Sequence, residues 1–210
     1  MSFTKVLLGF VPWIAFSLVA TRLGPNAVGV ACVLAFVVAG VLIVRSLRRG
    51  ESPKLLEVTG AVVFLVLAGV AVTVPGIDPF LASYGRALAA AILAIVIFAL
   101  LPVMPFTEQY ARESVPRQYW HTPEFRGVNR RISAIWGAAV AVMAVGHAIA
   151  GTFEVPDPGV GPLHRPVDLV FNWLIPGALV WYAAKQTQRI SGHDDSSGPD
   201  APTVAVRGRR

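Results

Sequence analysis

Six blocks of apolar residues run through this chain of 210 residues, and no other feature restricts its fold as strongly. Most of them reach the roughly 18–25 residues that a helix needs to cross a hydrocarbon layer about 30 Å thick. Hydrophobic residues make up 55% of the chain and charged residues only 14%, which is more apolar than a soluble core of this size requires. We therefore predict an all-α, polytopic membrane protein, a bundle of six transmembrane helices. The expected spans are 6–20, 27–44, 55–74, 80–103, 132–151 and 167–184.

Glycine and proline mark the turns between these blocks. Gly24-Pro25 follows the first block, and Pro75-Gly76 leaves so short a loop before the fourth that spans three and four should form an antiparallel hairpin. Residues 1–190 are expected to form one transmembrane domain. The tail 191–210 is polar and rich in Gly, Pro and Asp, a composition typical of disorder.

The first block is short and contains Pro12, which is expected to kink its helix because a proline inside a helix removes a backbone hydrogen bond. Its length also suits a signal peptide. However, Leu18 lies where a cleavage site before Ala20 would need a small residue. We therefore expect the block to stay in place as a span.

The basic residues predict the orientation. With the amino terminus in the cytoplasm, fifteen of them fall on the cytoplasmic side and two, Arg22 and Arg165, on the other, a strong positive-inside pattern. The pattern predicts a multi-pass protein of the cell membrane with both termini cytoplasmic, and it accounts for the net charge of +6 without nucleic acid as a partner. The fifteen are Lys5, Arg45, Arg48, Arg49, Lys54, Arg112, Arg117, Arg126, Arg130, Arg131, Lys185, Arg189, Arg207, Arg209 and Arg210.

The chain offers no set of residues that catalysis or a metal site would need. Only one of its four histidines, His147, lies in a span, and the single cysteine, Cys32, is expected to be a packing residue. No HExxH motif, cysteine pair or glycine-rich phosphate loop is present. We predict no catalytic residues, no cofactor, no metal and no enzymatic activity.

Ionisable groups inside a span are costly and call for an explanation. Arg86 lies about six residues into the fourth span, near its outer end. Its long side chain could extend to the outer headgroups. Alternatively it pairs with polar groups at the same depth, and His147, Asp168 and Asn172 would then complete a small outward-facing polar pocket. Glu57, at the cytoplasmic end of the third span, is expected to form an ion pair with Lys54.

The segment 105–131 is the one long stretch between blocks that is charged, aromatic and broken by prolines. Glu108 and Arg112, and Glu113 and Arg117, are spaced for ion pairs along a short helix that Pro116 would end. We expect an amphipathic segment lying along the cytoplasmic face, with aromatics in the interface and arginines on anionic phospholipid headgroups. The alternative is a docking surface for a partner protein. The residues of this expected surface are Phe106, Tyr110, Tyr119, Trp120, Arg126 and Arg130.

Several short motifs resemble the bacterial intracellular septation protein A family. They are Leu8-Gly-Phe10-Val-Pro12 before an apolar run, the basic patch after the second block, Pro105-Phe106, and Phe125-Arg-Gly-Val-Asn129 followed by Trp136. The chain departs from the family's pattern in three ways: the lysine expected before Pro105 is absent, Phe125 stands where tryptophan is usual, and Trp136 is displaced by about one helical turn. The resemblance covers most of the six-span region and implies a non-enzymatic role in division or envelope assembly, with division or envelope proteins as partners.

Two classes of function stay open. The first is a structural or interaction protein of the bacterial cytoplasmic membrane that contributes to septation or cell-envelope maintenance. The second is a small-solute or ion transporter or channel that uses the polar pocket, although transport sites usually lie nearer the membrane midplane. An enzyme acting on lipid is a distant third.

Overall fold

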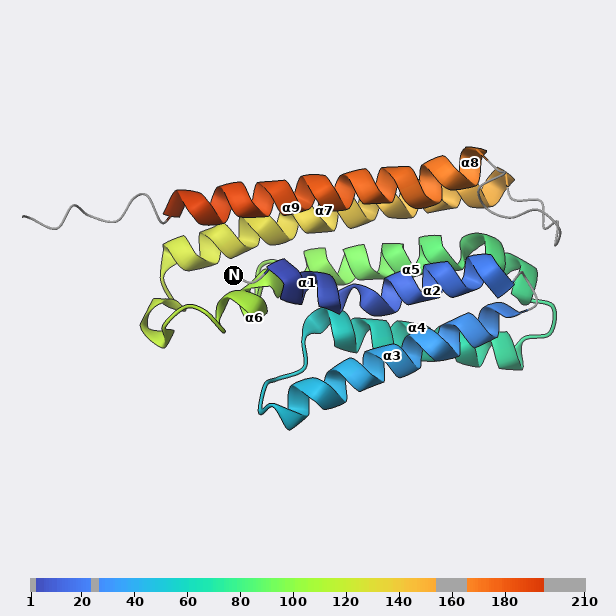
Figure 1. The fold of residues 1–210 in the computed structure, drawn as a ribbon, viewed down its shortest axis with the longest axis horizontal. Helices are drawn as coiled ribbons and strands as arrows, with labels where there is room; N and C mark the ends of the chain where they lie inside the picture. Colours follow the sequence, from blue (N-terminus) through green and yellow to red (C-terminus); the bar gives the residue numbers. More distant parts are fainter. Residues whose placement is uncertain (1–2, 24–26, 154–165, 195–210) are drawn as a thin grey trace, which may run out of the picture.

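The computed structural model describes residues 3–23, 27–153 and 166–194, and every regular element in those ranges is helical (Figure 1). The α-helices are α1 (Phe3–Gly9), α2 (Val11–Leu23), α3 (Val28–Arg48), α4 (Leu55–Thr73), α5 (Asp78–Leu100), α6 (Phe106–Ala111), α7 (Pro123–Phe153), α8 (Pro166–Leu169) and α9 (Ile175–Asp194). Two short elements complete the set: a 3-10 turn, η2 (Arg117–Tyr119), and a π-helical segment, η4 (Val170–Leu174), between α8 and α9.

Five helical stretches of the described residues are long and apolar enough to cross a membrane. They are α3, α4, α5, α7 and the run from α8 through α9. Their outer faces carry large apolar side chains such as Val41, Leu65 and Val145, each more than half exposed. Such a surface is favourable against lipid and unfavourable against water. The chain is a multi-pass helical membrane protein.

The first expected span is two helices rather than one kinked helix. The break falls at Phe10, between α1 and α2, where the Phe10 N–H donates to the carbonyl of Leu7 at 3.0 Å. Pro12 lies two residues further on, in the first turn of α2, where its missing N–H would have had no partner within the helix. Within this region Val11–Ala20 is an apolar helical stretch, but it is shorter than the other five.

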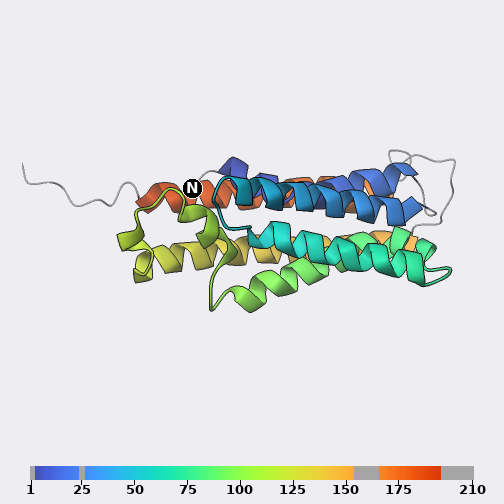
Figure 2. The same ribbon diagram turned by 90° about the horizontal axis from the view of Figure 1, so that it is seen from below.

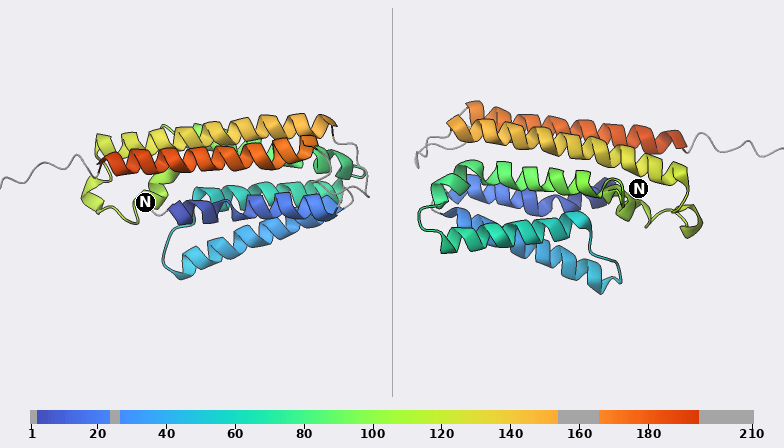
Figure 3. Two further views of the ribbon diagram at one scale, coloured as in Figure 1. Left: turned by 45° about the horizontal axis from the view of Figure 1, so that its top comes forward. Right: turned by 180° about the vertical axis from the view of Figure 1, so that it is seen from behind.

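The helices pack in an order that Figures 1 and 3 show from several sides. α7 and α9 lie side by side along one edge of the bundle and α3 and α4 along the opposite edge, with α2 and α5 between them. α4 and α5 form the predicted hairpin. Its tight turn includes Gly76 at φ +77°, a conformation that favours glycine.

Small residues let α5 and α7 approach closely. A Cβ added to Gly137 would lie 3.0 Å from Cγ2 of Ile97, and one added to Gly151 would lie 2.7 Å from the backbone oxygen of Ser83. Ser133, four residues before Gly137, is fully buried. This face of α7 packs inside the bundle, as expected of a small-residue stripe.

Two helices are longer than the sequence predicts. α7 begins at Pro123 rather than near residue 132, and its 31 residues span about 46 Å at 1.5 Å per residue. Because a hydrocarbon core is only about 30 Å thick, its charged first turns must project beyond the apolar layer, on the side of α6 (Figure 2). α9 continues to Asp194, so residues 191–194 are helical and not disordered; the rest of the predicted tail lies outside the described residues.

Candidate functional site

The structure brings together the four residues of the expected polar pocket. Arg86 comes from α5, His147 from α7, Asp168 from α8 and Asn172 from η4, and each side chain is more than nine-tenths buried. They therefore meet at the end of the bundle where α5 begins and α7 ends. Their meeting requires three separate helical segments to be packed correctly.

Hydrogen bonds link three of them in a fixed direction. Asn172 Nδ2 donates to Asp168 Oδ1 at 2.5 Å, and His147 Nδ1 lies 2.5 Å from Asn172 Oδ1. Because a carboxylate only accepts, the amide nitrogen of Asn172 must face Asp168, so its oxygen accepts the Nδ1–H of His147. In a neutral imidazole with this tautomer, Nε2 keeps its lone pair as an acceptor.

Arg86 joins this chain through Asp168. Its Nη2 lies 3.6 Å from Asp168 Oδ1, and the two charged side chains are 7% and 6% exposed. Separating such a pair would leave an uncompensated charge inside the bundle. The guanidinium of Arg86 therefore pairs with Asp168 inside the bundle. This is the second of the two predicted alternatives, and not the one in which the side chain extends to the headgroups.

The π-helical segment shapes the wall that carries Asn172. The N–H of Ile175 donates to the carbonyl of Val170, five residues back instead of four. Pro176 follows and has no N–H for the carbonyl of Asn172, so a wider turn is tolerated here. Wide turns of this kind recur at functional sites. This segment was not predicted from the sequence, where Pro176 inside the sixth span was the available signal.

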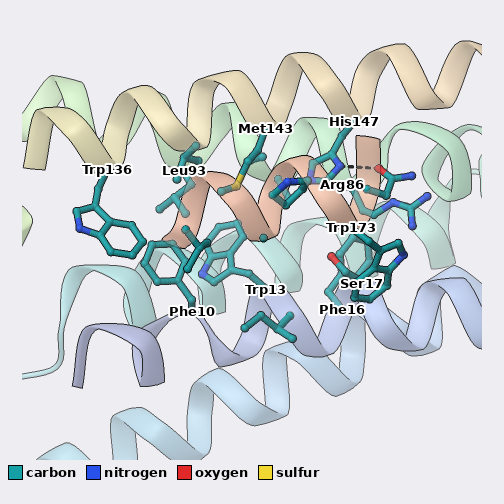
Figure 4. Close-up of a pocket in the computed structure, with 18 of the residues that line it drawn as sticks. Phe10, Trp13, Phe16, Ser17, Arg86, Leu93, Trp136, Met143, His147 and Trp173 are labelled. Carbon is teal, nitrogen blue, oxygen red and sulfur yellow. Dashed lines mark hydrogen bonds between the residues drawn. The ribbon is translucent and has the colours of Figure 1, made fainter. Parts of the chain in front are cut away.

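Next to the polar cluster is a cavity of about 360 Å³, bounded by α1, α2, α5, α7, η4 and α9. Figure 4 shows Trp136, Phe10 and Leu93 at one end and Arg86, His147, Ser17 and Trp173 at the other, with Trp13 and Met143 between them. The aromatic residues of the wall are Phe10, Trp13, Phe16, Trp136 and Trp173. A volume of this size falls in the range of ligand pockets, about 300–1,000 Å³.

The aromatic wall was not predicted from the sequence. Trp136 is fully buried, stacks on Phe10 with ring centroids 5.2 Å apart, and donates its Nε1–H to Thr187 Oγ1 at 3.1 Å. Aromatic residues in an apolar block are equally suited to face lipid. Only tertiary packing directs this set inward: Phe10 and Trp13 pack against the core cluster that includes Trp136.

The segment 105–131 is folded against the bundle, which corrects part of its predicted surface. Phe106 and Tyr110 are 0% and 3% exposed, so they pack inside the protein and not at a lipid or partner interface. The reason is that α6 docks on α7: the Thr107 hydroxyl donates to the carbonyl of Asn129 and lies 2.9 Å from Ser133 Oγ. Of the other expected surface residues, Tyr119, Arg126 and Arg130 are exposed.

Trp120, the sixth expected surface residue, is only partly exposed. The guanidinium groups of Arg112 and Arg117 lie 5.0 and 5.6 Å from its ring centroid, and its Nε1–H donates to the carbonyl of Val115 at 2.8 Å. Arg112 also forms the predicted ion pair with Glu108. Trp120 thus helps to hold the segment together.

Lys54 connects this segment to α4. Its ammonium pairs with Glu113 and not with Glu57, which corrects the predicted ion pair. Glu57 instead accepts the backbone N–H of Lys54 at 3.2 Å and the hydroxyl of Ser46 at 3.3 Å, so it caps the start of α4. Burial raises the pKa of the nearby Tyr110 phenol well above its usual range, and the carboxylates of Glu57 and Glu113 add to the shift.

Within the described ranges, no group of three or more His, Cys, Asp or Glu side chains is placed to hold a metal ion. Comparison of the chain with protein-family models, with curated proteins and with solved structures found no match in any of the three.

Proposed function

We propose that this chain is a non-enzymatic protein of the bacterial cytoplasmic membrane that contributes to septation or cell-envelope maintenance through contacts with proteins or lipids. The observation that carries the proposal is the folded cytoplasmic cap, which we define as residues 105–131. The resemblance of its sequence to the septation protein A family supports the same role. Division or envelope proteins would be its partners.

A topology of six spans with both termini in the cytoplasm belongs to this proposal. α1 and α2 would together form the first span, because α2 packs on α3 and α5 within the bundle and α1 continues from it. An even number of spans returns the carboxyl terminus to the side of the amino terminus. That arrangement keeps fifteen basic residues inside against two outside.

The cap offers an exposed surface beside the membrane. Arg126, Arg130 and Arg131 are exposed on the part of α7 that projects beyond the apolar layer, and Tyr119 is exposed on η2. Exposed arginines near anionic headgroups contribute about 1 kcal/mol each to surface attraction. The same residues could instead meet an acidic patch on a partner.

A deletion strain of the native host tests the proposal. The strain would be complemented with the intact protein, with a variant carrying Tyr119→Ala, Arg126→Ala and Arg130→Ala, or with a control carrying Arg45→Ala, Arg48→Ala and Arg49→Ala, which are exposed at the end of α3. We expect filamentation or misplaced septa that the intact protein and the control correct and the cap variant does not. Normal division in the deletion strain would refute the septation role.

The buried polar cluster favours a transporter or channel as the second candidate. Arg86, Asp168, Asn172 and His147 lie beside a cavity inside the bundle. A flux assay in proteoliposomes with small ions and solutes distinguishes the two classes. Flux that Asp168→Asn abolishes would favour transport over the envelope role.

A further inference from the structure

We propose that the aromatic cavity binds a lipid-soluble quinone or quinol, an uncharged ring carrying carbonyl or hydroxyl oxygens and an isoprenoid tail. The site lies within the bundle and away from the cytoplasmic cap. The proposal therefore does not depend on the envelope role. It concerns binding only.

The polar end of the cavity matches the oxygens of such a ring. Arg86 and His147 both line the cavity, and the guanidinium can donate to a carbonyl oxygen. Because His147 Nδ1 is engaged by Asn172, its Nε2 is the ring nitrogen that is left for the hydroxyl of a quinol. One end of the cavity thus presents a donor and an acceptor to the same head group.

The charge of the cluster selects an uncharged head. Asp168 already balances the charge of Arg86, so this pair carries no net charge. A phosphate or carboxylate head would therefore bring an uncompensated charge into a buried site, which is strongly unfavourable. A carbonyl or hydroxyl head needs only hydrogen bonds.

The walls suit a flat ring followed by an apolar chain. Five aromatic side chains line the cavity, three of them the indoles of Trp13, Trp136 and Trp173. Aromatic faces pack well against other flat rings. Along α7 the lining runs from Trp136 to His147, about 16 Å at 1.5 Å per residue, which leaves room for part of a tail beyond the head.

The cavity also reaches the outer surface of the bundle. Ile14 on α2 and Gly177 on α9 both line the cavity and are exposed. Both are apolar and belong to membrane-embedded helices, so the opening faces lipid. A ligand dissolved in the bilayer could enter there without crossing water.

Tryptophan fluorescence tests the proposal, because quinones quench indole emission on contact. The purified protein would carry Trp120→Phe and Trp181→Phe, which leaves only the three cavity indoles. In nanodiscs of uncharged lipid it would be titrated with a naphthoquinone bearing a short prenyl tail. Gly177→Leu fills the opening, and a Cβ at Gly177 meets nothing within 4 Å, so this variant should fold. Gly40→Leu is the matched control, at another open glycine that does not line the cavity.

We expect saturable quenching that Gly177→Leu weakens by about tenfold or more, equivalent to about 1.4 kcal/mol or more of binding free energy, and that Gly40→Leu leaves unchanged. Ala90→Leu, which narrows the cavity from α5, should have the same effect as Gly177→Leu and replaces it if that variant does not fold. Quenching that rises linearly and equally in all variants would overturn the proposal. Displacement of the quinone by diacylglycerol or by an alkyl phosphate as readily as by unlabelled quinol would also overturn it, since the site would then accept any amphiphile.

Discussion

Arg86 and Asp168 carry opposite charges inside the bundle, where either charge without the other would be unfavourable. The pair is completed by Asn172 and His147, which also fix the tautomer of the imidazole. Ion pairs buried this deeply contribute little net stability compared with apolar residues, but losing one partner is severe. The role of these residues is to hold a polar wall in one arrangement.

A double-mutant cycle measures this dependence. Asp168→Asn and Arg86→Leu should each lower the free energy of unfolding by about 3–5 kcal/mol, because each leaves the other charge buried without compensation. The double variant should lose less than the sum of the two. Thermal unfolding in detergent, followed by size-exclusion chromatography, provides the values. Additive losses would mean that the two residues are not coupled.

Tyr110 lies in the cap, with its hydroxyl buried and without a hydrogen-bond partner among the described residues. Tyr110→Phe should therefore be neutral or stabilise the protein by up to about 1 kcal/mol. Since the pKa of the phenol is raised on folding, its contribution to stability is complete below the unfolded value of about 10 and is lost as pH rises above it. Unfolding measured between pH 8 and 11 should show a smaller alkaline loss for Tyr110→Phe. Tyr119→Phe, at an exposed tyrosine, is the control, and an equal loss in both variants would contradict the assignment.

At the scale of elements, the spans could be predicted and their ends could not. Hydropathy identifies the residues that cross the apolar layer, so the observed bounds of α3, α4 and α5 lie close to the predicted ranges. Hydropathy does not detect a helix that continues into water, which is why residues 123–131 were expected to belong to the interfacial segment and not to the helix of the fifth span. Nor does it separate residues facing lipid from residues facing protein: Phe106 and Tyr110 have the helical spacing of an interfacial face, but they are core residues.

The polar pocket was predictable for a different reason. Few polar side chains lie inside the blocks, and a charge in the apolar layer needs a partner at its own depth. Arg86, His147, Asp168 and Asn172 satisfied both conditions. The π-helical segment and the aromatic cavity depend on how several helices pack together, and no local pattern in the sequence reports that packing.

The close contact between α5 and α7 can be tested by adding a methyl group at Gly151. Gly151→Ala would place a methyl group 2.7 Å from the backbone oxygen of Ser83, which a side-chain rotation cannot relieve. We expect a loss of about 1–3 kcal/mol, typical of overpacking. Gly69→Ala is the control, because it is also a glycine in a helix and has open space around its Cβ. Melting temperatures of the two variants in detergent should differ; if they match, the close approach of the helices is wrong.

For the whole molecule, the arrangement of helices separates two sites along the membrane normal. The cap, built from α6, η2 and the start of α7, lies at one end of the bundle, and the polar cluster lies at the other. The cavity extends between these levels along α7, from Trp136 to His147. A membrane protein of this form can present different chemistry to its two surfaces, so its orientation decides what each site can meet.

The orientation of the chain can be tested by labelling introduced cysteines, because the single native cysteine, Cys32, is buried and can be replaced first. In a Cys32→Ala background, Ser2→Cys and Ser197→Cys place one thiol near each end of the chain, and Thr73→Cys places one at the exposed end of α4. If α1 and α2 together complete a sixth span, a membrane-impermeant maleimide added to intact cells should label Thr73→Cys alone, and all three should react once the membrane is permeabilised. Labelling of either Ser2→Cys or Ser197→Cys, but not both, would indicate an odd number of spans. Labelling of both, with Thr73→Cys protected, would reverse the orientation and place the arginines of the cap outside the cell, against the positive-inside pattern.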